Sequence, residues 1–343
     1  MLTAADFSLS VVIPNYNDGR YITHCLESVL SQSVQPDEII VIDDASTDDS
    51  VSIISKVIAH IPCARLVLNS ANSGTNETMN RGLAMSRSRF VVFLSANDSI
   101  FAGMFEQARK SFMSHPTAGL WSGMIWLIDE RDQPLRLYRS AVVALQDRYL
   151  PPDECRRLAA RVGNWFAGTM VYRRETLMET GGFDGALKAL SDLVVCLAIS
   201  SRHGALFSPV AFCSTRVHDD SLRSRTLGDL STFNAVLTHF ERTAPSLAPQ
   251  LFDAQLISRT KDRWRFSAAA IAPNNIAALL TQHSSSVGQI AARTIAPVAR
   301  VTKSGSLALA YLILRPFDVI PTLWYRYILA MVLRLKNCTT PKP

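Results

Sequence analysis

The chain has 343 residues, 48% of them hydrophobic and 19% charged, so it can bury a sizeable core and is not a disordered protein. The formal net charge is +6, but residues 301–343 hold six basic side chains against one acidic, which argues against a nucleic-acid groove on the main domain. Six cysteines without a CxxC pair indicate a reducing compartment and no structural zinc, and the N-terminus shows no signal-peptide pattern.

Strands and helices are predicted to alternate through the first hundred residues. Short apolar runs predict buried strands at 9–14, 38–42, 65–68 and 90–94. Apolar residues at helical spacing predict helices at 20–32, 51–58 and 76–87. This alternation is typical of βαβ units with a parallel sheet and a nucleotide-binding half. The chain lacks GxGxxG after its first strand and lacks GxxxxGK[ST], so neither a dinucleotide site nor a P-loop is indicated.

Several segments resemble family 2 glycosyltransferases of the bacterial polysaccharide type, which have the GT-A fold. They are SVVIPNYND, EIIVIDDASTDDS and NSGTNETMNRGLAMSRSRFVVFLSAND, followed by the GGFD turn within 163–204 and by RVHDDSLRS. The resemblance covers about residues 8–225. It implies an α/β, GT-A-like fold with a mainly parallel sheet and flanking helices over 1–228. Residues 1–100 would be the nucleotide-binding half and 101–228 the acceptor half, followed by a helical extension over 229–343.

The resemblance implies that polar residues after the first and second strands bind the donor nucleotide. Pro14, Asn15 and Tyr16 would line the uracil site, with Tyr16 against the base, although they also fit an ordinary turn. Asp44 matches the carboxylate that bonds the nucleoside, and the alternative is an N-cap for the following helix.

The donor site is also expected to include the N-x-G…N pattern between the third and fourth strands. Asn72, Gly74 and Asn80 match this pattern in the family. Gly74 would allow a positive φ or a close approach to the donor. Met79 stands where many relatives carry Arg, so one expected phosphate or base contact is missing or comes from elsewhere.

A divalent cation, Mn²⁺ or Mg²⁺, is implied by the likeness to the family's acidic motif. Relatives commonly read D-A-D-D where this chain has Ser95, Ala96, Asn97 and Asp98. An amide oxygen such as that of Asn97 can coordinate such a cation but carries no charge, so we expect weaker metal binding. Asp98 and His218 are the expected metal ligands, Asn97 a donor contact, and a plain helix N-cap at Asn97 or Asp98 the alternative.

Asp192 is the predicted catalytic base, because it matches the family's carboxylate beyond the GGFD turn. The base would take the proton from the acceptor hydroxyl during an inverting transfer. Its apolar neighbours would raise its pKa if the carboxylate is buried, whereas a solvated aspartate at a helix start is the alternative. Ser191 replaces a first carboxylate that relatives often have. Residues 163–166, with Trp165 and Phe166, are expected to shape the acceptor pocket.

The last third of the chain carries no recognisable motif and consists of two segments that differ in composition. Residues 229–300 are rich in Ala and Leu and predict helices. Residues 305–336 combine apolar stretches, aromatic residues and basic residues without an uninterrupted run long enough to span a bilayer. This composition fits a segment in a membrane interface, and a helix docked on protein is the alternative. We therefore expect a cytoplasmic location, peripheral at the inner face of the plasma membrane if this segment contacts lipid.

Together these features predict transfer of a sugar from a nucleotide donor, a UDP-sugar, to a glycan or lipid-linked acceptor in polysaccharide biosynthesis. A catalytically silent binding or scaffold protein is the first alternative, favoured by Ser95, Asn97 and Ser191. A nucleotidyltransferase is the second, although the chain lacks a Gly- and Arg/Lys-rich triphosphate loop near its N-terminus. We expect no nucleic-acid partner.

Overall fold

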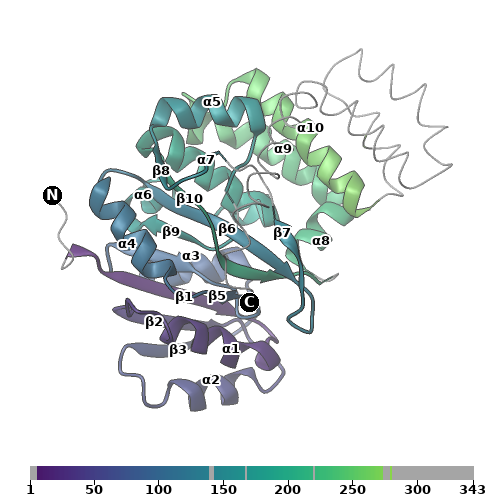
Figure 1. Ribbon diagram of the computed structural model, residues 1–343. Coiled ribbons are helices and arrows are strands. Elements are labelled where there is room, and N and C mark those ends of the chain that lie inside the picture. The colour runs from purple at the N-terminus through teal and green to yellow at the C-terminus, as the bar shows by residue number, and fades with distance from the viewer. Residues whose placement is uncertain (1–5, 139–142, 167, 219–220, 273–278, 280–343) are drawn as a thin grey trace.

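The computed structural model describes residues 6–138, 143–166, 168–218, 221–272 and 279 (Figure 1). Within these residues one mixed sheet has the strand order β3-β2-β1-β4-β9-β6-β10-β5, with β7 paired to β6 and β8 to β10. The strands are β1 (Leu9–Asn15), β2 (Glu38–Asp43), β3 (Ala64–Leu68), β4 (Phe90–Phe93), β5 (Ser99–Ile100), β6 (Leu120–Ile128), β7 (Pro134–Tyr138), β8 (Arg148–Leu150), β9 (Met170–Arg173) and β10 (Ala205–Arg216).

The helices cover both faces of this sheet. They are α1 (Gly19–Leu30), α2 (Ser50–Ile58), α3 (Thr75–Met85), α4 (Met104–Ser114), α5 (Pro152–Val162), α6 (Arg174–Glu179), α7 (Ser191–His203), α8 (Leu222–Gly228), α9 (Leu230–Leu247) and α10 (Ala254–Ile271), with a 3₁₀ turn η2 (Gly185–Leu190) before α7. The four strands and three helices predicted in the first hundred residues are all present, with ends that differ by a few residues.

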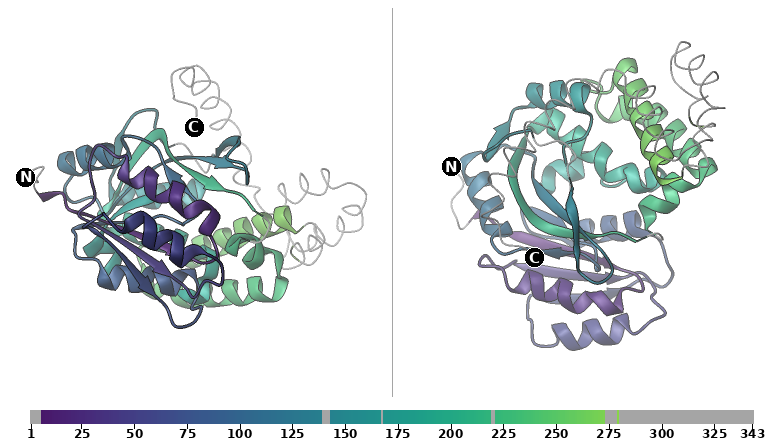
Figure 2. Two further views of the ribbon diagram at one scale, coloured as in Figure 1. Left: turned by 90° about the horizontal axis from the view of Figure 1, so that it is seen from below. Right: turned by 45° about the vertical axis from the view of Figure 1, so that its right-hand side comes forward.

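The N-terminal part of the sheet is a parallel four-stranded arrangement, β3-β2-β1-β4. Every residue of β1 and β2 is buried, which agrees with their continuous apolar sequences. Successive residues of β1 face opposite sides, so Val11 packs with α1, α2 and α4 while Val12 packs with α3. Figure 2 shows α1 and α2 on the side of the sheet opposite the C-terminal helices.

The second half of the sheet continues from the first through antiparallel pairing. β9 lies between β4 and β6 and runs antiparallel to both, and β10 runs parallel to β6. The β6–β7 hairpin extends beyond this sheet and carries the acidic residues Asp129, Glu130 and Asp132 near its turn. This hairpin reaches the candidate site described below.

Helices α9 and α10 confirm the helical prediction for the described part of 229–300. Their buried side chains belong to the same core cluster as those of α5 and α7, so they pack with these two helices. The predicted boundary at 228 and the predicted membrane contact of 305–336 stay predictions, and the latter segment lies outside the described residues. Within the described ranges, none of the helices combines the length and apolar character that crossing a bilayer requires.

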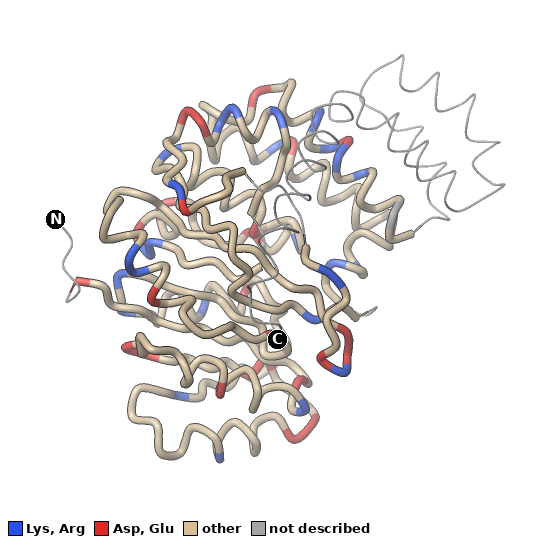
Figure 3. Tube along the Cα trace, in the orientation of Figure 1, with Lys and Arg blue, Asp and Glu red and all other residues tan. Residues whose placement is uncertain are grey.

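Basic residues are distributed over the whole described trace. Figure 3 shows lysines and arginines on both halves of the sheet and on the helices, interspersed with acidic residues.

Candidate functional site

The carboxyl ends of β1 and β2 are joined through their last residues. Asn15 and Asp43 are register partners, and the Asn15 amide nitrogen donates to Asp43 Oδ1 over 2.7 Å. The Asp44 N–H donates to the Asn15 carbonyl at 2.8 Å. Asn15 Oδ1 is buried and has no donor among the described residues. A buried acceptor of this kind is costly unless a ligand supplies the donor, and it lies at the sheet edge where ligands of α/β proteins bind.

The turns after β1 and β2 have unusual backbone conformations. Asn17 has φ 56° and Ala45 has φ 61°, both in the left-handed region that non-glycine residues rarely occupy. Asn17 Oδ1 accepts from the Thr47 N–H at 2.8 Å, which binds one turn to the other. Pro14 is buried, whereas Tyr16 is 46% exposed and offers its ring to solvent beside these turns.

Asp44 anchors the loop between β3 and α3. Its carboxylate accepts from Asn69 Nδ2 at 2.6 Å, from the Ser73 N–H and hydroxyl at 2.9 Å each, and from the Gly74 N–H at 2.8 Å. Burial raises the pKa of Asp44, but these hydrogen bonds together outweigh burial and hold the pKa below its usual value. Asp44 is therefore an anion, and a nucleoside that binds to it must share or replace one of these donors.

The three residues of the N-x-G…N pattern have different surroundings. Asn72 is exposed and its Oδ1 accepts from the Gly74 N–H at 3.1 Å. Gly74 has φ 87° with open space where a Cβ would be, as expected for the entry to α3. Asn80, however, donates to the Phe183 carbonyl and accepts from the Phe183 N–H, both at 2.8 Å. Asn80 thus binds the GGFD turn with both ends of its amide, and its predicted donor contact has no geometric support.

Asn97, Asp98 and His218 lie close together although 121 residues separate the first from the last. Asn97 Nδ2 and His218 Nε2 are 3.3 Å apart. Asp98 Oδ1 accepts from the Arg216 N–H at 2.9 Å and the carboxylate also receives a hydrogen bond from Thr215. Burial nevertheless raises the pKa of Asp98 to about 7.

Arg216 lies within the candidate site, and its contacts could not be predicted from the sequence. Its guanidinium donates to the Asn97 carbonyl at 3.2 Å, to the Asp129 carbonyl at 2.6 Å and to Asp132 Oδ1 at 2.5 Å. The same group lies 4.0 Å from the centroid of the Tyr21 ring. Arg216 therefore ties the Asn97 turn to the β6–β7 hairpin and to α1. The only signal in the sequence was its place in the R-x-H segment.

The described residues do not assemble a complete metal site. Over the part of the chain that the structure describes, no three His, Cys, Asp or Glu side chains gather as a metal-binding group. Asp98 is committed to the backbone of Arg216, and His218 faces an amide. Mg²⁺ and Mn²⁺ prefer several oxygen ligands, so this donor set fits them poorly and we derive no step through a metal. The predicted metal ligands Asp98 and His218 stay a prediction.

Asp192 lies in the first turn of α7 and reaches solvent. Its Oδ1 accepts from the Leu193 N–H at 2.7 Å. Protein surrounds the carboxylate on its other sides, and this desolvation raises its pKa, while the charge of Arg223 partly opposes the rise. The carboxylate is thus accessible to a substrate and more basic than an ordinary aspartate.

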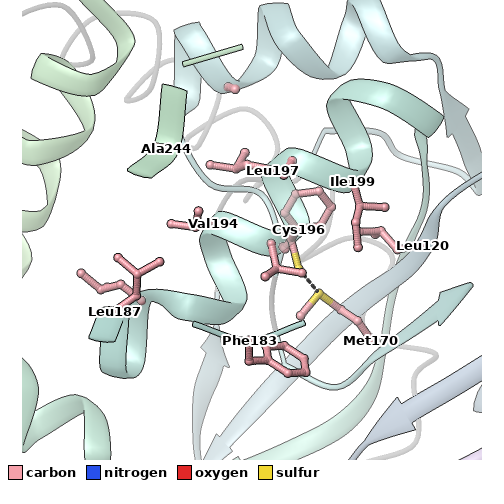
Figure 4. Close-up of a cluster of buried hydrophobic side chains, with 14 of the residues drawn as sticks. Leu120, Met170, Phe183, Leu187, Val194, Cys196, Leu197, Ile199 and Ala244 are labelled. Carbon is pink, nitrogen blue, oxygen red and sulfur yellow. Dashed lines mark hydrogen bonds between the residues drawn. The ribbon is translucent and has the colours of Figure 1, made fainter. Parts of the chain in front are cut away.

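The position of Asp192 is fixed by the packing behind it. Figure 4 shows the buried face of α7, where Val194, Cys196 and Leu197 pack among β9, η2 and α9. Before this helix, Asn76 Nδ2 donates to the Lys188 carbonyl at 3.0 Å, which joins η2 to α3. Phe93, at the end of β4, packs edge-on against Phe183 with 5.0 Å between ring centroids. The start of α7 therefore lies at the same edge of the sheet as the loops that follow the parallel strands.

The expectation for the aromatic residues of 163–166 was wrong. Trp165 and Phe166 are 1% and 3% exposed, belong to the core cluster and do not line the cavity between the helices, so neither presents a face to a sugar. Their rings pack against each other at 4.5 Å. Gly163 and Asn164 instead line a cavity between the helices, which is described further below.

Comparison with known proteins identifies the family. Residues 10–181, half of the chain, match the family described as glycosyl transferase family 2. This chain belongs to that family. The matched range contains every predicted donor-site residue, and it ends before Asp192 and His218. These two assignments therefore depend on the geometry described above.

Curated relatives share short or distant similarity with this chain. The uncharacterized glycosyltransferase YibD of Escherichia coli (strain K12) is 40% identical over 98 residues, which are 29% of this chain and 28% of YibD. The minor teichoic acid biosynthesis protein GgaA of Bacillus subtilis (strain 168) is 26% identical over 230 residues, 63% of this chain and 49% of GgaA. The chain thus spans less than two thirds of these relatives' length.

Solved structures of similar proteins show the same fold. TarS 1–349 of S. aureus, in complex with UDP-GlcNAc, has a TM-score of 0.53 at 16% identity, covering 86% of this chain and 92% of that one. A mannosyltransferase of Pyrobaculum calidifontis, in complex with GDP-Man and Mn²⁺, has a TM-score of 0.53 at 18% identity, covering 92% and 87%. At these identities the likeness concerns the fold alone.

Proposed function

We propose that this chain transfers a sugar from a UDP-sugar to a hydroxyl group of a glycan or lipid-linked acceptor, with inversion at the anomeric carbon, during polysaccharide synthesis. The observation that carries the proposal is the meeting of two features at one sheet edge. One is the set of donor-site loops around Asp44, and the other is the solvent-facing carboxylate of Asp192 at the start of α7. Membership in glycosyl transferase family 2 supports the reaction class.

The donor's nucleoside is assigned to the turns after β1 and β2. Tyr16 has an exposed ring that can stack on a base, and Asn15 Oδ1 is a buried acceptor for an N–H of that base. Asp44 supplies an anionic acceptor for further N–H or hydroxyl donors. The UDP-GlcNAc complex of TarS favours a uridine nucleotide, whereas the GDP-Man complex of the mannosyltransferase makes GDP the comparison to test.

The chemical step is assigned to Asp192. As the acceptor oxygen attacks the anomeric carbon, its proton passes to the Asp192 carboxylate and the bond between the sugar and the diphosphate breaks. A single displacement inverts the anomeric configuration. The raised pKa of Asp192 brings it closer to neutral pH and so makes it a better base than an ordinary aspartate.

Two measurements test this proposal. Calorimetric titration of UDP, with GDP as the comparison, is expected to show UDP binding, and repeating it with Mn²⁺ tests the metal prediction directly. Asp192→Asn is expected to lower turnover of the UDP-sugar at least about 100-fold and leave UDP affinity unchanged. The control is Glu175→Gln, which removes an exposed carboxylate on α6 and should keep normal turnover. Undiminished turnover of Asp192→Asn would refute the assignment of the base.

One observation favours a second candidate, a catalytically silent binding protein. Ser95, Asn97 and Ser191 replace carboxylates that relatives often have, and the described residues form no metal cluster. A silent protein would bind UDP without turning over any UDP-sugar, and the titration combined with the turnover assay separates the two candidates.

A further inference from the structure

A cavity of ≈ 150 Å³ lies between α5, α7, α8 and α10. A cavity of about this volume can hold benzene, so the space is sufficient for one six-membered ring. Its wall combines apolar side chains, among them Leu193, Leu227 and Trp264, with polar groups from Asn164 and Thr260. Apolar faces together with a few polar groups are typical of small-molecule sites.

The cavity adjoins the proposed catalytic base. Leu190 and Leu193, which line it, are two residues before and one residue after Asp192. Arg223, on α8, lines it as well, and its charge acts on the Asp192 carboxylate. A molecule in the cavity would therefore lie near Asp192, whose own side chain does not line the cavity.

The lining is positively charged. It contains two arginines, Arg223 and Arg263, and no aspartate or glutamate. The Arg263 guanidinium is held in place by the carbonyls of Ala159, Ala160 and Arg161 at the end of α5, at 3.1–3.2 Å. Arg223 is exposed and extends the positive charge to the side of Asp192.

Gly163 leaves the space that the Arg263 side chain occupies in the cavity wall. Gly163 has φ 78°, and a Cβ at this position would lie 2.9 Å from Arg263 Nη1 and 3.0 Å from its Cδ. A side chain at 163 would therefore push the guanidinium out of its place. The C-terminal end of α5, at Gly163, and the Arg263 side chain of α10 thus pack closely where they form the cavity wall.

We propose that this cavity is an acceptor subsite for one sugar ring that carries an anionic group, a carboxylate or a phosphate. The inference rests on the proposed function, since it makes the cavity part of the acceptor path beside Asp192. Leu193, Leu227 and Trp264 contact the C–H face of the ring, and Arg223 pairs with the anionic group. The substrate class is an acidic glycan whose anionic residue lies next to the sugar that receives the transfer.

The full chain labelled with 5-fluorotryptophan provides a local test. Trp264 is one of five tryptophans, and Trp264→Phe assigns its fluorine signal. Three probes are compared by titration: methyl glucuronide, methyl glucoside 6-phosphate and the neutral methyl glucoside. At least one anionic probe is expected to shift the Trp264 signal at concentrations where the neutral probe does not. A response to the glucuronide alone or to the phosphate alone supports the subsite and identifies the anionic group.

Arginine variants test the charge pairing. Arg223→Gln is expected to weaken binding of the responding anionic probe about tenfold, because a charge-assisted contact is lost. Arg225→Gln, on the same helix but outside the cavity, is the matched control and should bind normally. The proposal is overturned by an equal response to the neutral probe, by no response of Trp264 to any probe, or by equal binding in Arg223→Gln. UDP titration on the same sample tests the proposed donor site separately from the cavity. If the protein binds UDP but the Trp264 signal responds to none of the probes, only the subsite proposal is refuted.

Discussion

Replacement of Asp98 by Asn should change how the stability of the protein depends on pH. The Asp98 carboxylate is half-buried, and burial raises its pKa to about 7 from an ordinary value of 3.8. Between these two values the folded chain holds a proton that the unfolded chain releases. The contribution of Asp98 to stability is therefore fully present below about pH 4 and is lost as pH rises to 7. Asn does not titrate and can still accept from the Arg216 N–H.

The size of this effect follows from the pKa. Each pH unit between the unfolded and folded pKa values changes the free energy of unfolding by about 1.4 kcal/mol. From pH 5.5 to the folded pKa near 7 there are about 1.5 units, which gives about 2 kcal/mol. Above pH 7 Asp98 is ionised in both states and contributes no further change. The stability of Asp98→Asn relative to the wild type should therefore rise by about 2 kcal/mol between pH 5.5 and 8.5.

Urea denaturation in EDTA-containing buffer, followed by tryptophan fluorescence and circular dichroism, measures this difference at several pH values. Asp48→Asn is the matched control. Burial raises the Asp48 pKa, but hydrogen bonds from Ser50 and Gly19 outweigh burial and leave the pKa below its usual value. Its titration lies below pH 5.5, so Asp48→Asn should show a constant offset. The same constant offset for Asp98→Asn would refute the reasoning.

Three further predictions concern stability. Arg216→Gln should lower the free energy of unfolding by about 1–3 kcal/mol, because the carbonyls of Asn97 and Asp129 lose the donor that the buried guanidinium supplies, and a loss below about 0.5 kcal/mol in urea denaturation would contradict this. Ala45→Gly should raise it by about 0.5–1 kcal/mol by relieving the left-handed backbone, and a lower melting temperature would count against it. Gly82→Ala should lower it by about 1–3 kcal/mol, since the new Cβ would lie 2.2 Å from Val12 Cγ1, and calorimetric melting will decide.

The parallel half of the fold could be predicted because its strands have continuous apolar sequences. β1 and β2 are buried at every position and end in polar residues, so their location was evident without any structure. The other half was harder to predict, because β9 pairs with β4 and β6 from distant parts of the chain. Antiparallel pairing over such separations leaves no local pattern in the sequence.

For the candidate site, too, only part of the structure could be predicted from the sequence. A motif gives the position of a residue in the chain, but it does not give the direction of its side chain. Asn80 matched a donor-site pattern, yet its amide holds Phe183, and Trp165 matched an acceptor block, yet its ring is in the core. Arg216 makes contacts on three separate elements, and these contacts exist only after the chain has folded.

The pairing of β4 with β9 also limits how the enzyme can move. Phe90, Val91 and Val92 pair with Arg173, Tyr172 and Val171, so the parallel strands and the second part of the sheet are continuous. A hinge between these two parts would have to break this pairing and expose its buried residues to water. Motion that opens or closes the proposed site is therefore expected in the loops at the rim, such as the segment that Asp44 restrains, while the sheet stays rigid.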